Sequence, residues 1–171
     1  DPHDWDYDEG INLMKVLLVD RGYALYTDIW SDQPPLLTAM LSWWFKPFGP
    51  SAASARILIL FFSALILWSL YRATRKSVSE FAAAVAMLLL VLSEYYIRLS
   101  GAVMVGLPAL ALASLAAVIL VTGQRGWWRI VLSATIMALA LQTNIKARIP
   151  IPVCARCLLH FPHSRRSFTP N

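Results

Sequence analysis

The hydrophobic residues of this chain fall into long blocks separated by short basic loops. Four blocks lie at about residues 57–71, 81–97, 99–122 and 130–141. Blocks of this length are typical of helices that cross a lipid bilayer. Arg56 and Arg72 frame the first block, and long basic side chains at such ends can reach the membrane interface. The pattern predicts a transmembrane helical region of about four spans over residues 56–148.

Two of the loops between the blocks are basic. Their charged residues are Arg72, Arg75 and Lys76 in the first loop, and Arg125 and Arg129 in the second. Because cytoplasmic loops carry an excess of lysine and arginine, both loops are predicted to face the cytoplasm. Residues 1–55 are then predicted to lie outside the cytoplasm.

The segment before the first block has an amphipathic pattern of its own. Its apolar positions, Ile11, Met14, Leu17 and Leu18, share one helical face. Asn12, Lys15 and Asp20 fall largely elsewhere, and Gly22 is a suitable stop for the helix. A helix of this kind lies along a membrane interface. The predicted fold class is therefore all-α: polytopic membrane helices with an external acidic loop, residues 1–55, that contains an interfacial amphipathic helix.

Composition supports a bilayer as the surrounding solvent. Hydrophobic residues make up 58% of the chain, charged residues make up 15%, and the mean hydropathy is +0.57. These values exclude an ordinary soluble domain. The net charge of +5 does not indicate nucleic-acid binding, because eight of the ten acidic residues precede the first block while the basic residues punctuate the blocks. We therefore expect a lipid bilayer as a partner and no nucleic acid.

Acidic residues are concentrated in the external loop. Asp8 and Glu9 follow Asp4 and Asp6 closely, and Asp28 and Asp32 come shortly before a Pro-Pro pair. Such carboxylates can serve as a general base or share a divalent cation, with oxygen ligands favouring magnesium, calcium or manganese. Acids in the first turn of a helix also complement its dipole and cap free amides. Sequence spacing leaves both interpretations open.

One further acidic residue, Glu94, lies at membrane depth four residues before Arg98. Ionisable groups at that depth are candidates for a functional site. The same spacing is also the one that favours an ion pair within a helix. The two interpretations stay open at this stage.

The last segment, residues 149–171, differs in character. It has no apolar periodicity and carries Cys154, Cys157, His160 and His163. Zinc modules usually separate their two ligand pairs by a dozen or more residues, so this spacing argues against a zinc site. We interpret the segment as an atypical tail, disordered or out of frame after a premature stop. The sequence also begins without methionine, and we expect that an earlier helix is missing.

Short motifs occur along the chain in a distinctive order. They are Asp8-Glu9-Gly10, Gly22-Tyr23, Tyr26-Thr27-Asp28, Gln33-Pro34-Pro35-Leu36, Phe48-Gly49 and Ala55-Arg56. In this order they resemble the GT-C glycosyltransferases, in the bacterial branch similar to protein mannosyltransferases and the lipid A aminoarabinose transferase. The resemblance covers roughly residues 5 to 148.

The resemblance implies a multi-pass enzyme of the inner membrane that works on the extracytoplasmic face. It implies transfer of a sugar from a polyprenyl-phosphate donor to a hydroxyl of a lipid, glycan or protein acceptor. The matching positions are Asp8 and Glu9 for catalysis, Asp32 with Asp8 for a divalent metal ion, and Tyr26 and Gln33 for substrate. Arg56 and Arg98, both predicted near the outer interface of the membrane, are the basic residues that could contact the donor phosphate in place of a lysine at position 33. Gln33 stands where relatives often have lysine, and an amide cannot neutralise a phosphate.

Two other classes of protein share some of these features. A transporter or channel subunit, or a non-catalytic assembly subunit, can also carry an acidic external loop for binding. The transporter is disfavoured because the predicted membrane interiors have no ionisable residue apart from Glu94. Since related enzymes have many more spans, we expect 171 residues to be inactive alone.

Overall fold

The structure is a computed structural model that describes residues 7–122 and 126–144. Within this part of the chain the helices are α1 (Tyr7–Asp20), α2 (Leu36–Phe48), α3 (Ala52–Ser77), α4 (Glu80–Val91), α5 (Glu94–Gly101), α6 (Gly106–Thr122) and α7 (Trp127–Thr143). A single bridge between Leu25 and Ile29 is the one β-type pairing in the described residues. The predicted all-α class is confirmed. The prediction for residues 149–171 lies outside the described residues.

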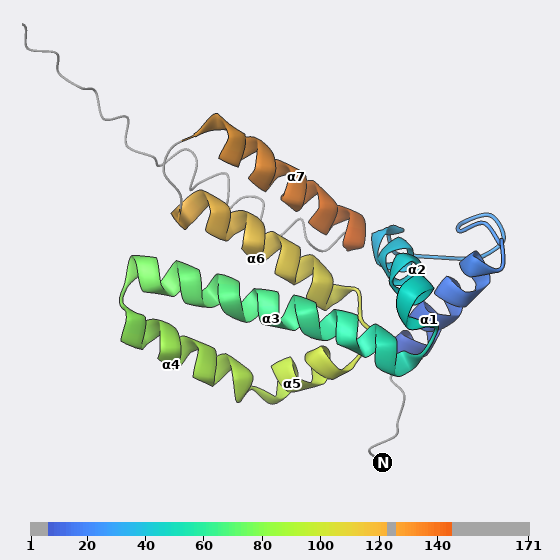
Figure 1. Cartoon of the computed structure of the whole chain (residues 1–171), viewed down its shortest axis with the longest axis horizontal. Coiled ribbons are helices and arrows are strands. Elements are labelled where there is room, and N and C mark those ends of the chain that lie inside the picture. The colour runs from blue at the N-terminus through green and yellow to red at the C-terminus, as the bar shows by residue number, and fades with distance from the viewer. Residues whose placement is uncertain (1–6, 123–125, 145–171) are drawn as a thin grey trace, which may run out of the picture.

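Four helices lie side by side in one layer, in the order α4, α3, α6 and α7 (Figure 1). The neighbours α3 and α6 run in the same direction, and α4 and α7 run in the opposite direction. Helices α1 and α2 lie together across one end of this layer, beside the beginning of α3. The short helix α5 and the loop after it return the chain to the same end. Residues 7–51, the described part of the loop predicted to be external, therefore form a cap over one end of the bundle.

Helix α3, with 26 residues, is the one helix in the described part of the chain that is long and apolar enough to cross a membrane by itself. Helices α4 and α5 meet that test only together, and they are bent by 68° at their junction. Helices α6 and α7 have 17 residues each, slightly fewer than the about 20 that span a bilayer without thinning. The four predicted hydrophobic blocks thus form helices of unequal reach.

Two predicted boundaries are corrected by the structure. The block at 81–97 is not one straight helix, because α4 ends at Val91 and α5 begins anew at Glu94. Ser93 between them has an extended backbone, the conformation from which a helix starts. The block at 99–122 begins its helix only at Gly106, so Pro108 lies in the first turn, where its missing N–H removes no helical hydrogen bond.

The core joins the cap to the bundle. Its most completely buried side chains include Val16 of α1, Leu37 and Leu41 of α2, Ile59 of α3 and Leu107 of α6. Because these five residues come from four helices and form one cluster, the cap is packed onto the ends of α3 and α6. This packing holds the cap in a fixed position on the bundle.

Helices α6 and α7 meet through small residues. Ala109 and Ala113 of α6 pack with Ala140 of α7, and all three are at most 3% exposed. The Ser133 hydroxyl donates to the backbone carbonyl of Ala116 at 2.9 Å. Small residues and inter-helix hydrogen bonds of this kind are typical of helix packing within membranes.

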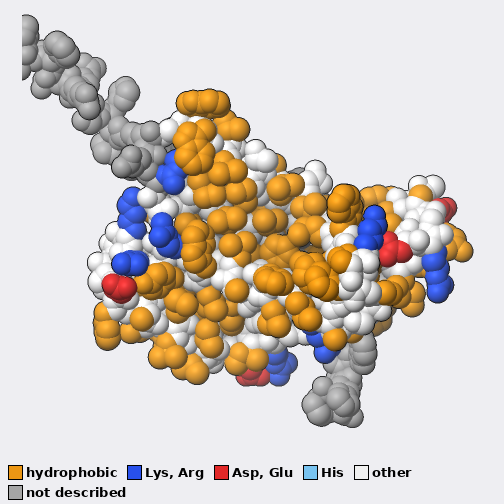
Figure 2. All heavy atoms as spheres, in the orientation of Figure 1, with side chains coloured by type: hydrophobic (Ala, Val, Ile, Leu, Met, Phe, Trp, Pro, Cys, Tyr) orange, Lys and Arg blue, Asp and Glu red, His pale blue; other side chains and the backbone are white. Residues whose placement is uncertain are grey.

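Apolar side chains cover most of the visible surface of the bundle (Figure 2). Exposed residues such as Phe61, Leu88, Leu89 and Ile130 contribute to this cover. A continuous apolar surface of this kind is suited to lipid rather than to water.

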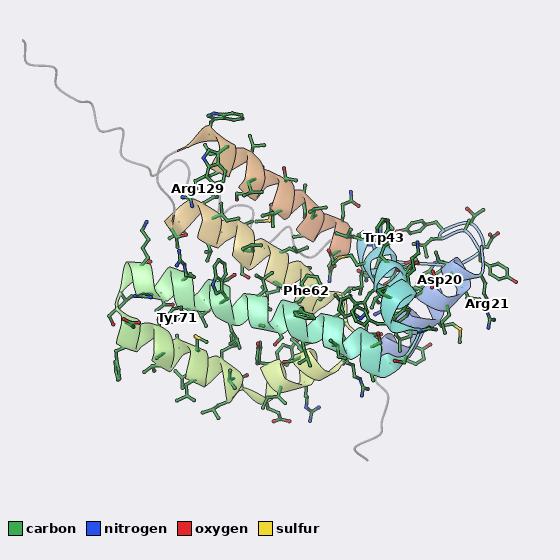
Figure 3. All side chains as sticks on the ribbon, in the orientation of Figure 1. Asp20, Arg21, Trp43, Phe62, Tyr71 and Arg129 are labelled. Carbon is green, nitrogen blue, oxygen red and sulfur yellow. The ribbon has the colours of Figure 1, made fainter. Side chains whose placement is uncertain are left out.

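Basic residues gather at the end of the bundle opposite the cap (Figure 2). Lys76, near the end of α3, donates to the carbonyl of Thr122 at the end of α6, at 2.9 Å. Arg75 lies 3.7 Å from Glu80 at the start of α4. Arg129, at the start of α7, lies at the same end of the bundle as Tyr71 of α3 (Figure 3). The described residues of both basic loops therefore lie at one end of the molecule, which agrees with the predicted placement of both loops on one side of the membrane.

Candidate functional site

A cavity of about 460 Å³ lies where the cap meets the bundle. Its walls come from α1, from the segment before α2, from α5 and from the loop that leads into α6. The lining residues are Asp8, Ile11, Asn12, Lys15, Trp30, Asp32, Gln33, Tyr95, Leu99, Met104, Val105 and Gly106. The volume is in the range of small-molecule sites, and polar groups enter mainly from the cap side.

Helix α1 supplies four of these residues at helical spacing. Asp8, Ile11, Asn12 and Lys15 are three, four and seven positions apart, and so they share one face. The Asn12 side chain donates to the carbonyl of Val103 at 2.9 Å, which fixes this face against the α5–α6 loop. Position along one helix therefore sets the distance between the acid at one end of the cavity and the amine at the other.

The chain returns to the cavity through a tight turn after α1. Gly22 has φ +95°, a conformation that favours glycine, and it ends the helix as predicted. The Asp28 carboxylate accepts a 2.8 Å hydrogen bond from the backbone N–H of Ala24 and so closes the following turn. Asp28 serves the turn and does not line the cavity.

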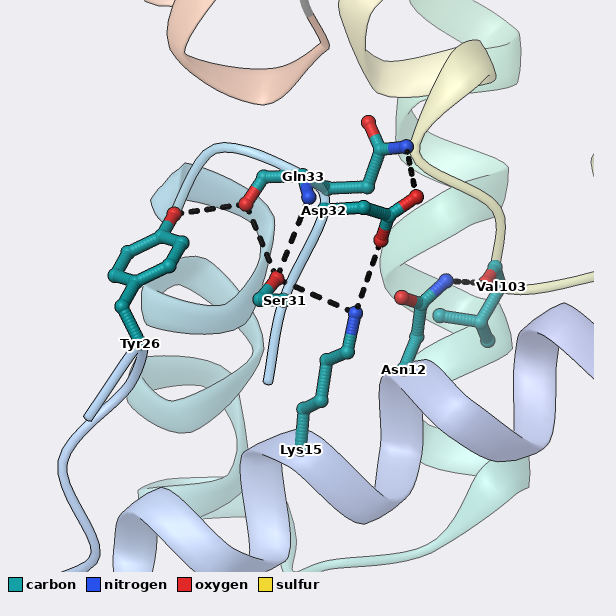
Figure 4. Close-up of polar contacts among 7 residues, drawn as sticks. All are labelled: Asn12, Lys15, Tyr26, Ser31, Asp32, Gln33 and Val103. Carbon is teal, nitrogen blue, oxygen red and sulfur yellow. Dashed lines mark hydrogen bonds and ion pairs between the residues drawn. The ribbon is translucent and has the colours of Figure 1, made fainter. Parts of the chain in front are cut away.

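Asp32 and Lys15 form the centre of a polar network (Figure 4). The Lys15 ammonium lies 3.5 Å from Oδ1 of Asp32 and donates to Oγ of Ser31 at 3.3 Å. The Gln33 side-chain amide donates to Oδ2 of Asp32 at 3.0 Å. This hydrogen bond, aided by the charge of Lys15, holds the pKa of Asp32 below its usual value. The carboxylate is consequently ionised at neutral pH.

Tyr26 supports the network from outside the cavity. Its hydroxyl donates to the backbone carbonyl of Gln33 at 2.7 Å (Figure 4). Tyr26 adopts a positive φ of 75°, which is uncommon for a residue other than glycine. The predicted substrate contacts Tyr26 and Gln33 therefore lie together, with Gln33 lining the cavity and Tyr26 holding its backbone.

Glu9 points away from the cavity and into the protein. Its side chain is 1% exposed and accepts two hydrogen bonds from Arg56, one from Nε at 2.9 Å and one from Nη2 at 2.8 Å. This bidentate pair joins α1 to the beginning of α3. The structure thus gives Glu9 and Arg56 a mutual contact that orients α1, rather than a position on the cavity wall.

Glu94 and Arg98 pair with each other on the surface of α5, at 2.8 Å. Their side chains are 79% and 77% exposed. The interpretation as a pair within one helix is confirmed. Arg98 does not line the cavity, although Tyr95 and Leu99 of the same helix do.

Asp8 and Asp32, the two residues predicted to bind a metal ion, line different walls of the cavity: Asp8 is in α1, and Asp32 is in the segment before α2. The described part of the chain brings no group of three or more His, Cys, Asp or Glu side chains together for a metal ion. The cation closest to Asp32 is Lys15. This donor set does not match the ligand number that magnesium or calcium prefers, so no catalytic step is assigned to a metal.

Sequence reasoning missed Lys15 and Asn12. Both were assigned to the polar side of an interfacial helix, yet Lys15 is 5% exposed and Asn12 is partly buried. Met14 and Leu17, on the apolar face that is predicted to lie along a membrane interface, are 57% and 37% exposed. The available signal was the polar stripe that begins at Asp8 and recurs at helical spacing, which was overlooked in favour of the apolar stripe.

The helical bundle and its apolar surface are those of a membrane protein, and the family comparison supports a glycosyltransferase of the GT-C type. Residues 32–170 match the profile of the family described as dolichyl-phosphate-mannose-protein mannosyltransferase, and the chain belongs to this family. The match includes Asp32 and Gln33, begins after Asp8, and continues past Arg148, where the resemblance was expected to end. No curated protein and no solved structure matches the chain.

Proposed function

We propose that the chain carries the acceptor-activating part of a membrane glycosyltransferase that uses a polyprenyl-phosphate-linked sugar. The observation that supports this function most directly is that Asp8 and Asp32 line one cavity, at the end of the bundle opposite the gathered basic residues. Family membership supports sugar transfer, and the positive-inside rule supports an extracytoplasmic position of the cavity.

Asp8 is the proposed general base. Its carboxylate lines the cavity and is exposed, so an acceptor hydroxyl can approach it. Asp8 takes the hydroxyl proton while the acceptor oxygen forms a bond to the anomeric carbon. The bond from that carbon to the phosphate oxygen breaks, and its electron pair leaves with the polyprenyl phosphate. Attack opposite the leaving group inverts the anomeric centre.

Glu9 has a positioning role in this proposal. Its buried pair with Arg56 fixes the first turn of α1 against α3, and Asp8 is the adjacent residue of that turn. The two acids of the Asp8-Glu9 motif therefore have different roles in the proposal: Asp8 faces the cavity and reacts, and buried Glu9 holds α1 in place.

The test measures sugar transfer by spheroplasts that express the protein. The added acceptor does not cross the membrane, so transfer to it reports activity on the external face. Asp8→Asn is expected to lower transfer by at least about 100-fold, the smaller end of a general-base contribution. Glu94→Gln is the matched control, because that carboxylate is 79% exposed and lies outside the cavity lining. Unchanged transfer in Asp8→Asn contradicts the assigned base, and transfer seen only after the membrane is opened contradicts the external face.

The same assay is run on the chain of 171 residues and on any longer reading frame of its gene. We expect the cavity described here to be necessary and not sufficient for transfer. Transfer that does not depend on Asp8 in either form would instead support a binding subunit.

A further inference from the structure

Lys15 is a buried amine that the proposed reaction has not yet used. Its side chain is 7% exposed, and the residue lines the cavity together with Asp8 and Asp32. Burial of an ammonium is costly unless anions or hydrogen-bond acceptors compensate it. The compensation around Lys15 therefore shows what kind of group the site accepts.

Three groups surround the ammonium, and each is at long range. Asp32 is 3.5 Å away, Ser31 accepts at 3.3 Å, and the centre of the Trp30 ring lies at 6.0 Å. Ammonium–carboxylate hydrogen bonds at full strength are about 2.7–2.9 Å long. Lys15 is thus held at the cavity wall without a tight anionic partner.

The two arginines that were predicted to bind substrate do not line the cavity. Arg56 is paired bidentately with buried Glu9, and Arg98 lies on the surface of α5, outside the cavity lining. Among the residues that line this cavity, the one lysine or arginine is Lys15. Any positive charge that the described cavity offers to a ligand consequently comes from Lys15.

The spacing of Asp8 and Lys15 suits a displacement reaction. The two residues lie seven positions apart on one helical face, so their backbones are separated by about 10 Å along the axis at 1.5 Å per residue. A hydroxyl, an anomeric carbon and a phosphate in line need a span of this order. The base is then at the attacking end and the ammonium is at the leaving end.

We propose that Lys15 binds the phosphate of the polyprenyl-phosphate donor, and that this ammonium takes the place of a metal ion at Asp32. The proposal rests on the proposed function for the identity of the donor. Asp32 and Gln33 orient the amine, and a phosphate oxygen that gains the electron pair of the broken bond receives a hydrogen bond from it. An electrostatic contact to the developing charge of a leaving group is usually a large part of catalysis.

Binding of farnesyl phosphate, which carries no sugar, provides the first test. The purified chain in phosphatidylcholine nanodiscs is titrated while tryptophan fluorescence is followed, since Trp30 lines the cavity. Lys15→Met is expected to raise Kd by about tenfold or more, as for loss of a charge-assisted hydrogen bond, and Lys15→Arg to stay within about threefold. Farnesol, which has no phosphate, is the control ligand, and its binding should not change in Lys15→Met.

Asp32→Asn gives a second test, in which a phosphate contact to Lys15 and a phosphate contact to a metal ion predict different changes in affinity. This test remains informative if Lys15→Met does not fold. Asparagine keeps an oxygen that can accept from the Lys15 amine and so keeps it oriented, but it removes the competing negative charge. If Lys15 binds the phosphate, affinity is therefore unchanged or increased. If a metal held by Asp32 binds the phosphate, the same change lowers affinity, and EDTA lowers it in the unmodified chain. Either of the latter results, or equal Kd values for Lys15→Met and the unmodified chain, overturns the proposal.

Failure of this proposal can be distinguished from failure of the proposed function. Loss of transfer in Asp8→Asn with an unchanged Kd in Lys15→Met rejects the phosphate contact and retains the transferase. Binding of farnesyl phosphate that depends on Lys15, with sugar transfer in a longer reading frame that is unchanged by Asp8→Asn, supports the anion site and rejects the assigned reaction.

Discussion

The protein contains two Glu–Arg pairs that look alike chemically and differ in position. Glu9 and Arg56 are 47 residues apart in sequence, and the glutamate is 1% exposed. Glu94 and Arg98 are four residues apart, and both side chains are more than three-quarters exposed. Both pairs include an N···O contact of 2.8 Å. The N···O distance therefore does not show how much each pair contributes to the fold.

The difference follows from where each pair lies in the fold. The first joins the cap to the bundle and leaves a carboxylate with little solvent if it is broken. The second lies along one turn of one helix, where about 0.3–0.5 kcal/mol is typical. Sequence spacing revealed the second pair, and only the three-dimensional structure, which places the start of α1 beside Arg56 of α3, revealed the first.

Arg56→Met is expected to have the largest effect on this comparison. It leaves Glu9 buried without its bidentate partner and should lower the free energy of unfolding by about 3 kcal/mol, the lower end for a broken buried pair, because Arg56 itself is 44% exposed. The measurement is unfolding in detergent micelles by SDS titration. Adding Glu9→Gln should recover part of the loss, and a strictly additive double mutant would argue against direct coupling.

Ser133→Ala is expected to have an intermediate effect. The hydroxyl joins α7 to α6 over 17 residues of sequence, it is buried, and its bond carries no charge. Its loss should cost about 0.6–1 kcal/mol, as for neutral hydrogen bonds within and outside membranes. The same unfolding assay applies, with the exposed Thr135→Ala as a control because its hydroxyl bonds to its own helix. If Ser133→Ala lowered the free energy of unfolding as much as Arg56→Met, the charge of the broken contact would have no effect on stability beyond that of its burial.

Arg98→Gln is expected to have the smallest effect. The free energy of unfolding should change by less than about 0.5 kcal/mol, since the pair is exposed and local. Sugar transfer should stay within twofold of the unmodified protein, because Arg98 is outside the cavity lining. A large loss of transfer with unchanged stability would return Arg98 to the list of substrate contacts.

Patterns of local period were read correctly from the sequence. The helical character of each block, the stop at Gly22 and the Glu94–Arg98 pair all depend on neighbours within a few residues. The break before Glu94 was missed because residues 81–97 are continuously apolar up to Ser93, and no proline marks the junction.

The candidate site was predicted only in part, for a physical reason. Asp8 and Asp32 were placed in the same external loop, and the structure brings both to one cavity. Lys15 was missed because its burial depends on the position of α1 in the fold, which the Asn12–Val103 hydrogen bond fixes across 91 residues of sequence. Contacts over that separation leave no period in the sequence.

The bond between Asn12 and Val103 also sets an order of events during synthesis. Its two partners are 91 residues apart, so the cavity has no far wall until α5 and the following loop have been made. At about 5–20 residues per second, this takes roughly 5–18 seconds after Asn12 is made. Glu9 waits for Arg56 about half as long, over 47 residues. The ion pair can therefore form before the cavity closes, and α1 is anchored on α3 when its polar face meets the last wall.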